Sequence, residues 1–394
     1  MRQAAYIHIP FCRRRCFYCD FPISVIGDRA RGETSNSMAE YVEWLCKEII
    51  ATPKDASPLK TVFLGGGTPS LLSVQQVEQI LQCLDHEIGI EDQAEISMEM
   101  DPGTFSSEQL QGLLSLGLNR ISLGVQAFQD NLLERCGRSH RKSDIHDTIE
   151  ILRQLNVDNF SLDLISGLPN QTAEDWTNSL KQAIDIHPHH LSCYDMVLEP
   201  LTVFGKQDSR GQLELPEDSL TAQMYRQASE TLKAAGYDHY EISNYAKPGY
   251  QCQHNMTYWH NKDFYGFGMG AASYHRDRRV TRPRTRADYY SWVTQLQHNP
   301  THLFAQTSIL DKSDRLFESV MLGLRLSTGI DLTTMNLPSE RMQQIHAAIV
   351  PFLDNGWVQT TSASHALHIR LSDPEGFLYS NQVLVSIWEA LDPN

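Results

Sequence analysis

The chain has 394 residues, of which 21% are charged and 41% hydrophobic, and its formal net charge is −15 at pH 7. This composition is ordinary for a globular protein, the length supports more than one domain, and the acidic balance argues against general nucleic-acid binding. No apolar run approaches membrane-spanning length, and a strand-like segment begins so early that no room is left for a signal peptide.

The first strand-like segment, Tyr6–Ile9, leads into a loop that contains Cys12, Cys16 and Cys19. Three thiolates at this spacing can bind three irons of an iron–sulfur cubane, and no fourth cysteine follows in the loop. The fourth iron would then have an open coordination position for a substrate or cofactor. In zinc sites such an open position distinguishes a catalytic site from a structural one. The alternatives are a zinc site that recruits His8, or three buried thiols.

The other five cysteines are scattered along the chain without a pairing pattern. They are Cys46, Cys83, Cys136, Cys193 and Cys252. Such usage is typical of a reducing compartment, where an oxygen-sensitive cluster also persists, so we expect a cytoplasmic protein.

From Tyr6 to about Pro200 the chain alternates short strand-like runs with amphipathic helical stretches. The predicted strands are Tyr6–Ile9, Thr61–Leu64, Glu95–Glu99, Arg120–Leu123, Phe160–Ile165 and His190–Met196. The predicted helices are about Ser37–Ala51, Ser73–Glu87, Ser106–Leu116, Asp144–Leu155 and Thr172–Ile186. Six βα-type repeats predict an α/β fold with a parallel sheet, either open and doubly wound or curved into a partial barrel.

Polar residues and glycines gather at the ends of successive predicted strands, and this favours the barrel. Gly65–Thr68 follow the second strand, Glu99 ends the third, Gln126 follows the fourth, and Asp163 lies toward the end of the fifth. Barrel active sites form on this face. Glycines let the backbone approach a ligand, and the polar side chains can bind an amine, a ribose or an adenine edge. Taken singly, each of these side chains is more often structural.

Four segments together resemble the oxygen-independent coproporphyrinogen III oxidase family of radical S-adenosylmethionine (SAM) proteins: Tyr6–Cys12, Gly65–Pro69, Ser122–Gln126 and Asp163–Pro169. The resemblance implies a radical SAM partial (β/α)6 TIM-type barrel, with one 4Fe-4S cluster and SAM beside it, and a smaller, mainly helical C-terminal domain. It implies that the cluster ligands are Cys12, Cys16 and Cys19. It implies SAM contacts from Tyr6, Tyr18, Gly66, Gly67, Thr68, Glu99, Gln126, Arg138 and Asp163.

Within that family, the chain resembles the heme-chaperone branch more than the true oxidases. The oxidases carry a further cysteine where this chain has Phe21, and they have a longer N-terminal extension. The segment His254–Trp259 matches the HNxxYW motif that is associated with heme binding in the chaperone branch. The resemblance therefore implies heme-binding residues His254, Asn255, Tyr258 and Trp259, with Cys252 and His260 as alternative ligands. An imidazole can ligate heme iron, and aromatic rings can pack on the macrocycle.

The implied function is that of a protein that binds heme and transfers it to an acceptor hemoprotein, for which a membrane location is one alternative. The other hypothesis is radical SAM decarboxylation of coproporphyrinogen III to protoporphyrinogen IX, in which the cofactor carries the radical chemistry. The heme-chaperone motif and Phe21 favour the first. A zinc-stabilised binding module, without iron or SAM, is a third interpretation.

Two arginine-rich stretches stand out in an acidic chain: Arg276–Arg286, which contains six arginines, and Arg13–Arg15 inside the cysteine loop. The first can bind heme propionates, an anionic partner or a membrane surface, or it is a solvated loop that balances the acidic surplus. The second lies where an acidic electron donor, a ferredoxin or flavodoxin, could reach the cluster.

From about Asn299 the βα alternation ends. The predicted elements are helices at Asp314–Leu326 and Glu340–Val350, with Pro351 beyond the second, a hairpin within Thr360–Leu371 and a last helix at Asn381–Ala390. We therefore expect a radical SAM barrel at residues 1–235, a connecting region with the HNxxYW motif at 236–298, and a C-terminal domain of the oxidase-family type at 299–394.

Overall fold

The computed structural model describes residues 1–28, 31–304, 309–335, 337–363 and 366–391. The chain forms two compact units, one of Met1–Pro216 with Asp263–Ser308 and one of Glu217–Lys262 with Ile309–Asn394. These boundaries differ from the expected ones at 235 and 298. The reason is that the chain leaves the first unit before the HNxxYW motif and returns to it afterwards.

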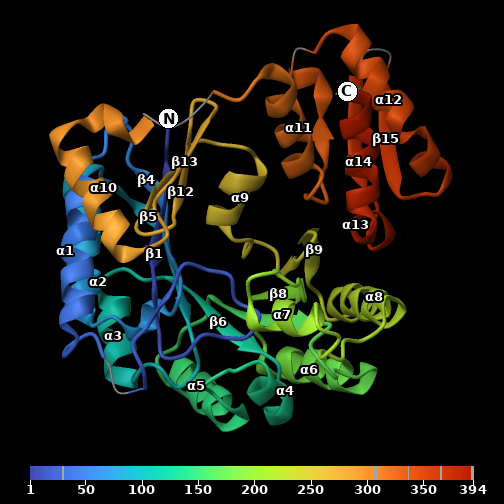
Figure 1. Ribbon diagram of the computed structural model, residues 1–394. Helices are drawn as coiled ribbons and strands as arrows, with labels where there is room; N and C mark the ends of the chain where they lie inside the picture. The colour runs from blue at the N-terminus through green and yellow to red at the C-terminus, as the bar shows by residue number, and fades with distance from the viewer. Residues whose placement is uncertain (29–30, 305–308, 336, 364–365, 392–394) are drawn as a thin grey trace. The chain divides into compact units, whose positions relative to one another are not determined.

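The first unit is built on a parallel sheet whose strands follow one another in chain order (Figure 1). They are β1 (Ala4–Ile9), β4 (Leu59–Gly66), β5 (Ile90–Met100), β6 (Arg120–Gln126), β7 (Phe160–Ser166) and β8 (His190–Asp195). All six predicted strands are confirmed. A short strand that was not predicted, β11 (Tyr265–Phe267), pairs in parallel with β1 and brings the returning chain to the edge of the sheet.

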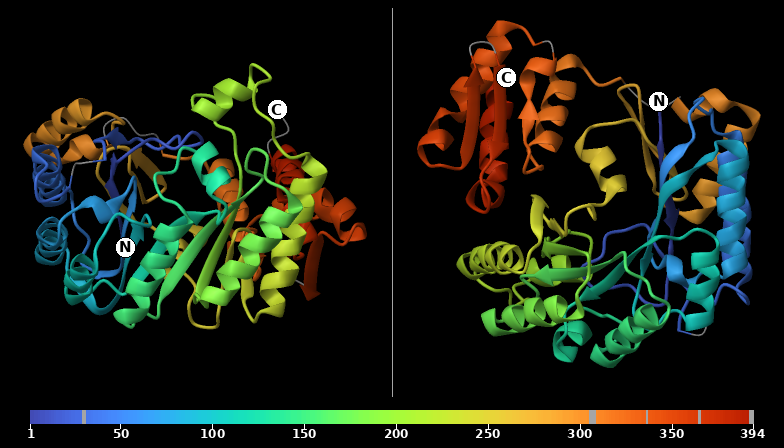
Figure 2. Two further views of the ribbon diagram at one scale, coloured as in Figure 1. Left: turned by 90° about the horizontal axis from the view of Figure 1, so that it is seen from below. Right: turned by 180° about the vertical axis from the view of Figure 1, so that it is seen from behind.

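Helices pack along the outer face of the curved sheet (Figure 2). They are α1 (Asn36–Ala51), α2 (Val74–Glu87), α3 (Ser107–Ser115), α5 (Lys142–Gln154) and α6 (Ala173–Ile186). Together with the sheet they form the expected partial barrel. Two short helices, α4 (Asp130–Arg135) and α7 (Val203–Asp208), lie beside the cysteine loop instead, since the Phe17 amide donates to the Cys136 carbonyl and the Phe204 amide donates to the Phe17 carbonyl, both at 3.0 Å. The unit also contains a hairpin, β12 (Ala272–His275) and β13 (Arg278–Thr281), and the helix α10 (Arg286–His298).

Side-chain caps fix the starts of two helices on the outer face. Ser106 caps α3, because its hydroxyl accepts a hydrogen bond from the Gln109 amide at 3.2 Å. The Gln109 side chain donates to the carbonyls of Ser70 and Leu72, at 3.0 and 2.7 Å, and does not complete a capping box. A full capping box forms at Ser73 on α2.

The second unit is mainly helical, with a three-stranded antiparallel sheet. Its elements are α8 (Asp218–Ala234), β9 (Asp238–Glu241), β10 (Asn244–Ala246), α9 (Gln253–Trp259), α11 (Lys312–Gly323), β14 (Ile330–Asp331), α12 (Ser339–Asp354), β15 (Val358–Ala363), β16 (Ala366–Leu371), α13 (Glu375–Leu378) and α14 (Ser380–Leu391). The predicted hairpin and last helix are confirmed. Val320, Ile345 and Ile387 belong to its buried core.

Two predicted helix ends are wrong in this unit. Helix α12 runs through Pro351 to Asp354, because Phe352 and Leu353 pack against the core and this burial outweighs the lost backbone hydrogen bond. Helix α11 ends at Gly323 rather than Leu326, because Leu326 forms a β-bridge with Glu241. None of the helices in the described ranges combines the length and apolar composition that crossing a bilayer requires.

Candidate functional site

A cavity of about 330 Å³ lies in the first unit, at the carboxyl ends of the strands. Its wall includes the cysteine loop, the glycine loop after β4, and side chains from β5 to β8. Glu99 near the end of β5 and Asp101 just beyond its end both line the cavity. Side chains alternate between the two faces of a strand, so residues two apart at the end of β5 can reach the same side. The same alternation brings in Ser122 on β6 and Asp163 on β7.

Most of the predicted site residues meet in this cavity. Its wall contains Cys12, Cys16, Cys19, Tyr18, Gly66, Gly67, Thr68, Glu99, Gln126, Arg138 and Asp163. Tyr6 is not among the described residues that line it, because its hydroxyl is bonded to His8 Nδ1 at 3.0 Å and its ring stacks on Phe63.

The cysteine loop is held at both ends by backbone hydrogen bonds. At its start, β2 (Phe11–Cys12) pairs with β3 (Ser24–Val25). In its middle, the Phe17 amide donates to the Cys136 carbonyl at 3.0 Å, and the Phe17 ring packs edge-on against Phe204. The stretch between these anchors carries Cys16, which lines the cavity together with Cys12 and Cys19.

The thiols are chemically suited to a metal cluster. Burial, together with nearby Asp101, raises the pKa of Cys12 to about 12, and burial raises the pKa of Cys19. Metal binding would therefore displace protons that these thiols hold at neutral pH. In the described part of the chain, no three His, Cys, Asp or Glu side chains converge as a single ion requires. In a cubane each cysteine binds a different iron, so three cysteines on one loop need not converge on one ion.

His8 is unsuited to the alternative role of zinc ligand. Its Nε2 is hydrogen-bonded to the Pro22 carbonyl at 2.9 Å, and its Nδ1 to the Tyr6 hydroxyl. Burial lowers the pKa of His8 to about 4, so the ring is neutral at physiological pH. Both nitrogens are thus occupied in a structural role beside the loop.

The glycine loop leaves no space for side chains. A Cβ on Gly66 would lie 2.4 Å from the His8 ring, and one on Gly67 would lie 2.7 Å from the Phe11 carbonyl oxygen. Gly66 also has a φ of 111°, which favours glycine. Its amide donates a hydrogen bond to Glu99 Oε2 at 2.8 Å. The loop therefore brings bare backbone and a carboxylate together at one wall of the cavity.

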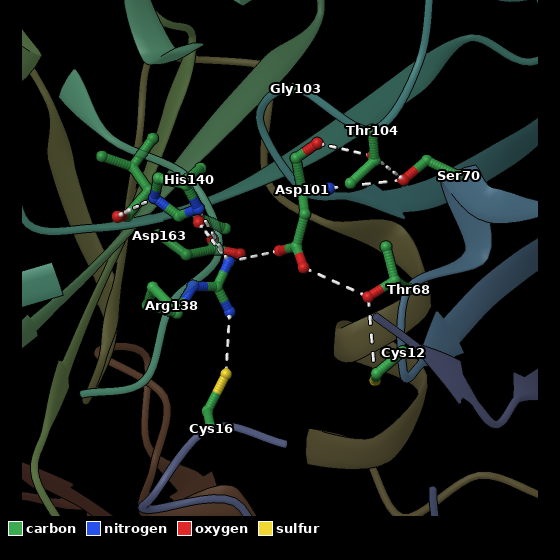
Figure 3. Close-up of polar contacts among 12 residues, drawn as sticks. Cys12, Cys16, Thr68, Ser70, Asp101, Gly103, Thr104, Arg138, His140 and Asp163 are labelled. Atoms are coloured by element: carbon green, nitrogen blue, oxygen red, sulfur yellow. Dashed lines mark hydrogen bonds and ion pairs between the residues drawn. The ribbon is translucent and has the colours of Figure 1, made fainter. Parts of the chain in front are cut away.

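Arg138 and Asp101 form the polar centre of the site (Figure 3). The Arg138 Nη2 group donates to Asp101 Oδ1 and, at 2.8 Å, to the Gly124 carbonyl, and its Nη1 lies 3.5 Å from Cys16 Sγ. The Thr68 hydroxyl donates to Asp101 Oδ2 at 3.1 Å. Asp101 was not predicted as a site residue, although its position two residues after Glu99, just beyond the end of β5, could have indicated it.

Gln126 and Asp163 are held on the neighbouring strands. Gln126 has a φ of 66° after a register shift in the β6–β7 pairing, and such a left-handed backbone is uncommon for a residue with a side chain. The Ser122 hydroxyl donates to Asp163 Oδ2 at 2.9 Å. Burial raises the pKa of Asp163.

The ionised form of Glu99 is unfavourable in the ligand-free protein. Burial is the main reason that its pKa is raised to about 7, and nearby Asp163 and Asp101 add to the shift, while the Gly66 amide opposes it. A cationic amine in the cavity would reverse this penalty. The arrangement of thiols, bare backbone, carboxylates and the buried Arg138 therefore suits a ligand with both an ammonium and a carboxylate group.

We expect Glu99→Gln to stabilise the ligand-free protein above about pH 7 and to leave its stability unchanged below about pH 4. When the pKa of a carboxyl group is higher in the folded than in the unfolded state, the protein loses stability as the pH rises from the unfolded-state pKa to the folded-state pKa. The amide of glutamine does not ionise, so the variant avoids that loss. The gain is up to about 3 kcal/mol, and glutamine can still accept the Gly66 hydrogen bond. Urea unfolding of both proteins across this pH range measures the difference in the free energy of unfolding. An equal difference at every pH would contradict the raised pKa of Glu99.

The HNxxYW segment lies in the second unit and forms the short helix α9. His254 and Tyr258 are four residues apart and so share a helix face, where His254 Nε2 is bonded to the Tyr258 hydroxyl at 2.7 Å. His254 is only 1% exposed, whereas Asn255 and Trp259 are half-buried. Cys252 is buried, and His260 is exposed with its Nδ1 bonded to the Met256 carbonyl.

The arginine-rich stretch does not form a single patch. Arg282 is fully buried and pairs with Glu48 at 2.7 Å, while Arg284 donates to the Asp20 carbonyl in the cysteine loop at 2.6 Å. Arg278 and Arg279 lie over the rings of Phe304 and Tyr274. Much of this charge therefore has a structural role inside the first unit.

Comparison with known proteins extends this picture to the whole chain. Residues 6–183 match the radical SAM superfamily, and residues 310–372 match the HemN C-terminal domain. The heme chaperone HemW of Synechocystis sp. is 47% identical over an alignment of 407 residues, which covers 100% of this chain and 98% of that protein. The heme chaperone HemW of Bacillus subtilis is 36% identical, over 83% of this chain and 84% of that protein.

Among solved structures, coproporphyrinogen III oxidase (HemN) from Escherichia coli, a radical SAM enzyme, has a TM-score of 0.79. The match covers 98% of this chain and 90% of that one, at 21% sequence identity. It shows a shared fold, including the parallel sheet that carries the cavity.

Proposed function

Because the chain belongs to the heme chaperone HemW family, within the radical SAM superfamily, we propose that it binds heme and passes it to an acceptor hemoprotein. The observation that carries the proposal is helix α9, which places an imidazole and two large aromatic rings on one short segment. Imidazole is a common axial ligand of heme iron, and flat rings pack well against a macrocycle. The acceptor is a hemoprotein in the membrane or in solution, and the scattered cysteines favour the cytoplasm for the chaperone itself.

We also propose that the cavity of the first unit holds a 4Fe-4S cluster and SAM. Cys12, Cys16 and Cys19 hold the cluster, which supplies single electrons to SAM when both are bound. Glu99 accepts hydrogen bonds from the ammonium group of SAM, and Arg138 neutralises its carboxylate.

The rest of the SAM molecule lies along the strand ends in this proposal. Gly66, Gly67 and Thr68 present backbone groups to the methionyl part, whereas Gln126 and Asp163 bind ribose or adenine. Tyr18, which is part of the cavity wall, packs beside them. Tyr6 supports the site only through its hydrogen bond to His8.

Heme ligation by His254 Nε2 requires the Tyr258 hydroxyl to leave, since that hydroxyl now occupies the nitrogen. We therefore expect Tyr258→Phe to raise heme affinity by about fivefold, the usual worth of one hydrogen bond. Heme titration followed by Soret absorbance measures this. Weaker binding by the phenylalanine variant would mean that the hydroxyl contacts heme rather than competing with it.

An acidic electron donor, a ferredoxin or flavodoxin, is proposed to dock beside the cysteine loop. Arg14 borders the cavity, and its side chain is 61% exposed although it pairs with Asp28 at 2.8 Å. Arg14→Gln should slow cluster reduction by a flavodoxin several-fold at low salt and little at high salt. The exposed Arg210 supplies the control variant. Unchanged reduction kinetics in Arg14→Gln would remove the proposal.

The oxidase function is the second candidate, because the chain shares the fold of the HemN enzyme. Phe21 argues against it: this side chain borders the cavity, where the oxidases carry a cysteine, and it has no ionisable or polar group. One experiment separates the two functions. The reconstituted, heme-loaded protein is mixed with an apo b-type hemoprotein, and in parallel the heme-free protein receives coproporphyrinogen III, SAM and a reductant.

Heme transfer at a rate that rises with the acceptor concentration, without any protoporphyrinogen, is the result that the chaperone function predicts. Protoporphyrinogen formation over many turnovers would establish the oxidase function instead.

A further inference from the structure

Arg325 lies beside the HNxxYW helix in the second unit, and its backbone is fixed there by hydrogen bonds. Its carbonyl accepts from the Ile242 amide at 3.1 Å, and the next residue, Leu326, forms a β-bridge with Glu241. Its guanidinium carbon lies 4.3 Å from the centre of the Trp259 ring. A cation on a rigid backbone is therefore stacked on the last aromatic residue of the proposed heme-binding motif.

The guanidinium group uses only part of its hydrogen-bonding capacity. Its Nη2 donates to Glu241 Oε2 at 3.1 Å, and the Glu241 side chain is fully buried. The other oxygen of Glu241 is taken by the Ser243 amide and the Asn244 side chain. Arginine has five N–H donors, and a carboxylate binds best to two of them at once.

Two donors of these stacked side chains are buried and have no hydrogen-bond partner among the described residues: Arg325 Nε and Trp259 Nε1. Buried N–H groups normally find an acceptor, so an unpaired pair of donors is a site where an acceptor would be bound strongly. The nearby Glu241 carboxylate disfavours a doubly charged anion such as phosphate. The chemistry that fits is a singly charged carboxylate.

We propose that Arg325 and Trp259 form a carboxylate site that binds one propionate group of heme. The inference rests on the proposed function. It adds Arg325, from the segment after α11, to the residues of the HNxxYW motif. The Arg325 side chain is 29% exposed, so a carboxylate can reach the guanidinium group from solvent.

The test compares heme with heme whose propionates are methyl esters, using the full-length, cluster-reconstituted protein. The wild type should prefer free heme by about tenfold, since the ester cannot pair with a guanidinium. Arg325→Met should abolish the preference. Arg370→Met should keep it, because Arg370 is an exposed arginine of the same unit that donates to Gln359 at 2.8 Å.

Two further variants distinguish loss of the carboxylate site from a disturbed fold. Arg325→Lys keeps a cation beside buried Glu241 and should restore part of the preference, and Trp259→Phe keeps the ring but removes the N–H and should reduce it. If Arg325 only supports α9, the variants lower the affinities for free heme and for the heme ester equally, and the ratio of the two affinities stays unchanged. That result overturns the carboxylate site but not heme binding itself. If the wild type binds neither ligand, the proposed function fails as well.

Discussion

Replacing Cys16 by serine is expected to abolish the iron–sulfur cluster and to leave heme affinity unchanged. A serine hydroxyl holds its proton far more firmly than a thiol and is a poor iron ligand, and with Cys12 and Cys19 alone the loop offers two thiolates. Heme binding should survive, because the proposed heme residues belong to the other unit. Iron and sulfide analysis after anaerobic reconstitution measures the loss.

Cys193→Ser is the matched control for this prediction. Cys193 lies on β8, is buried, and does not belong to the cysteine loop. It is therefore a thiol of the same unit that differs from Cys16 in position. Equal loss of iron from both variants would show that instability, and not ligation, removes the cluster.

His254→Ala is expected to weaken heme binding by at least about 100-fold while the cluster stays intact. Loss of a partner that merely orients a metal ligand already lowers affinity 10- to 100-fold, and loss of the axial ligand itself should exceed that. Difference absorbance on heme titration measures the change. The Soret band of residual complex should also move, because the ligand field of the iron changes.

His260→Ala is the control, because His260 ends the same helix and is exposed. It was an alternative ligand, and a larger loss in His260→Ala than in His254→Ala would assign ligation to it. If His254→Ala and Cys16→Ser each lost both heme and cluster to the same extent, heme and cluster would not occupy separate sites.

The barrel could be predicted from the sequence because its signals are local. Each parallel strand is a short apolar run, and each ends in a glycine or polar residue that has to face the ligand side. The cysteine loop, the glycine loop, Glu99, Gln126 and Asp163 therefore pointed to one cavity, and the structure brings them together there.

Other features were missed because they depend on contacts between distant segments. β11 has three residues, too few for a periodicity, and only its pairing with β1 shows that the chain returns to the first unit. Asp101 becomes a site residue through Arg138 and Thr68, from two other segments. The motif itself predicted neither the burial of His254 nor the stacking of Arg325 on Trp259.

The most direct test of the account is an anaerobic heme titration of the wild-type, cluster-reconstituted protein. The account predicts saturable binding at about one heme per chain, with the absorbance of a histidine-ligated heme. Binding that never saturates would contradict the chaperone function and make coproporphyrinogen turnover the activity to pursue.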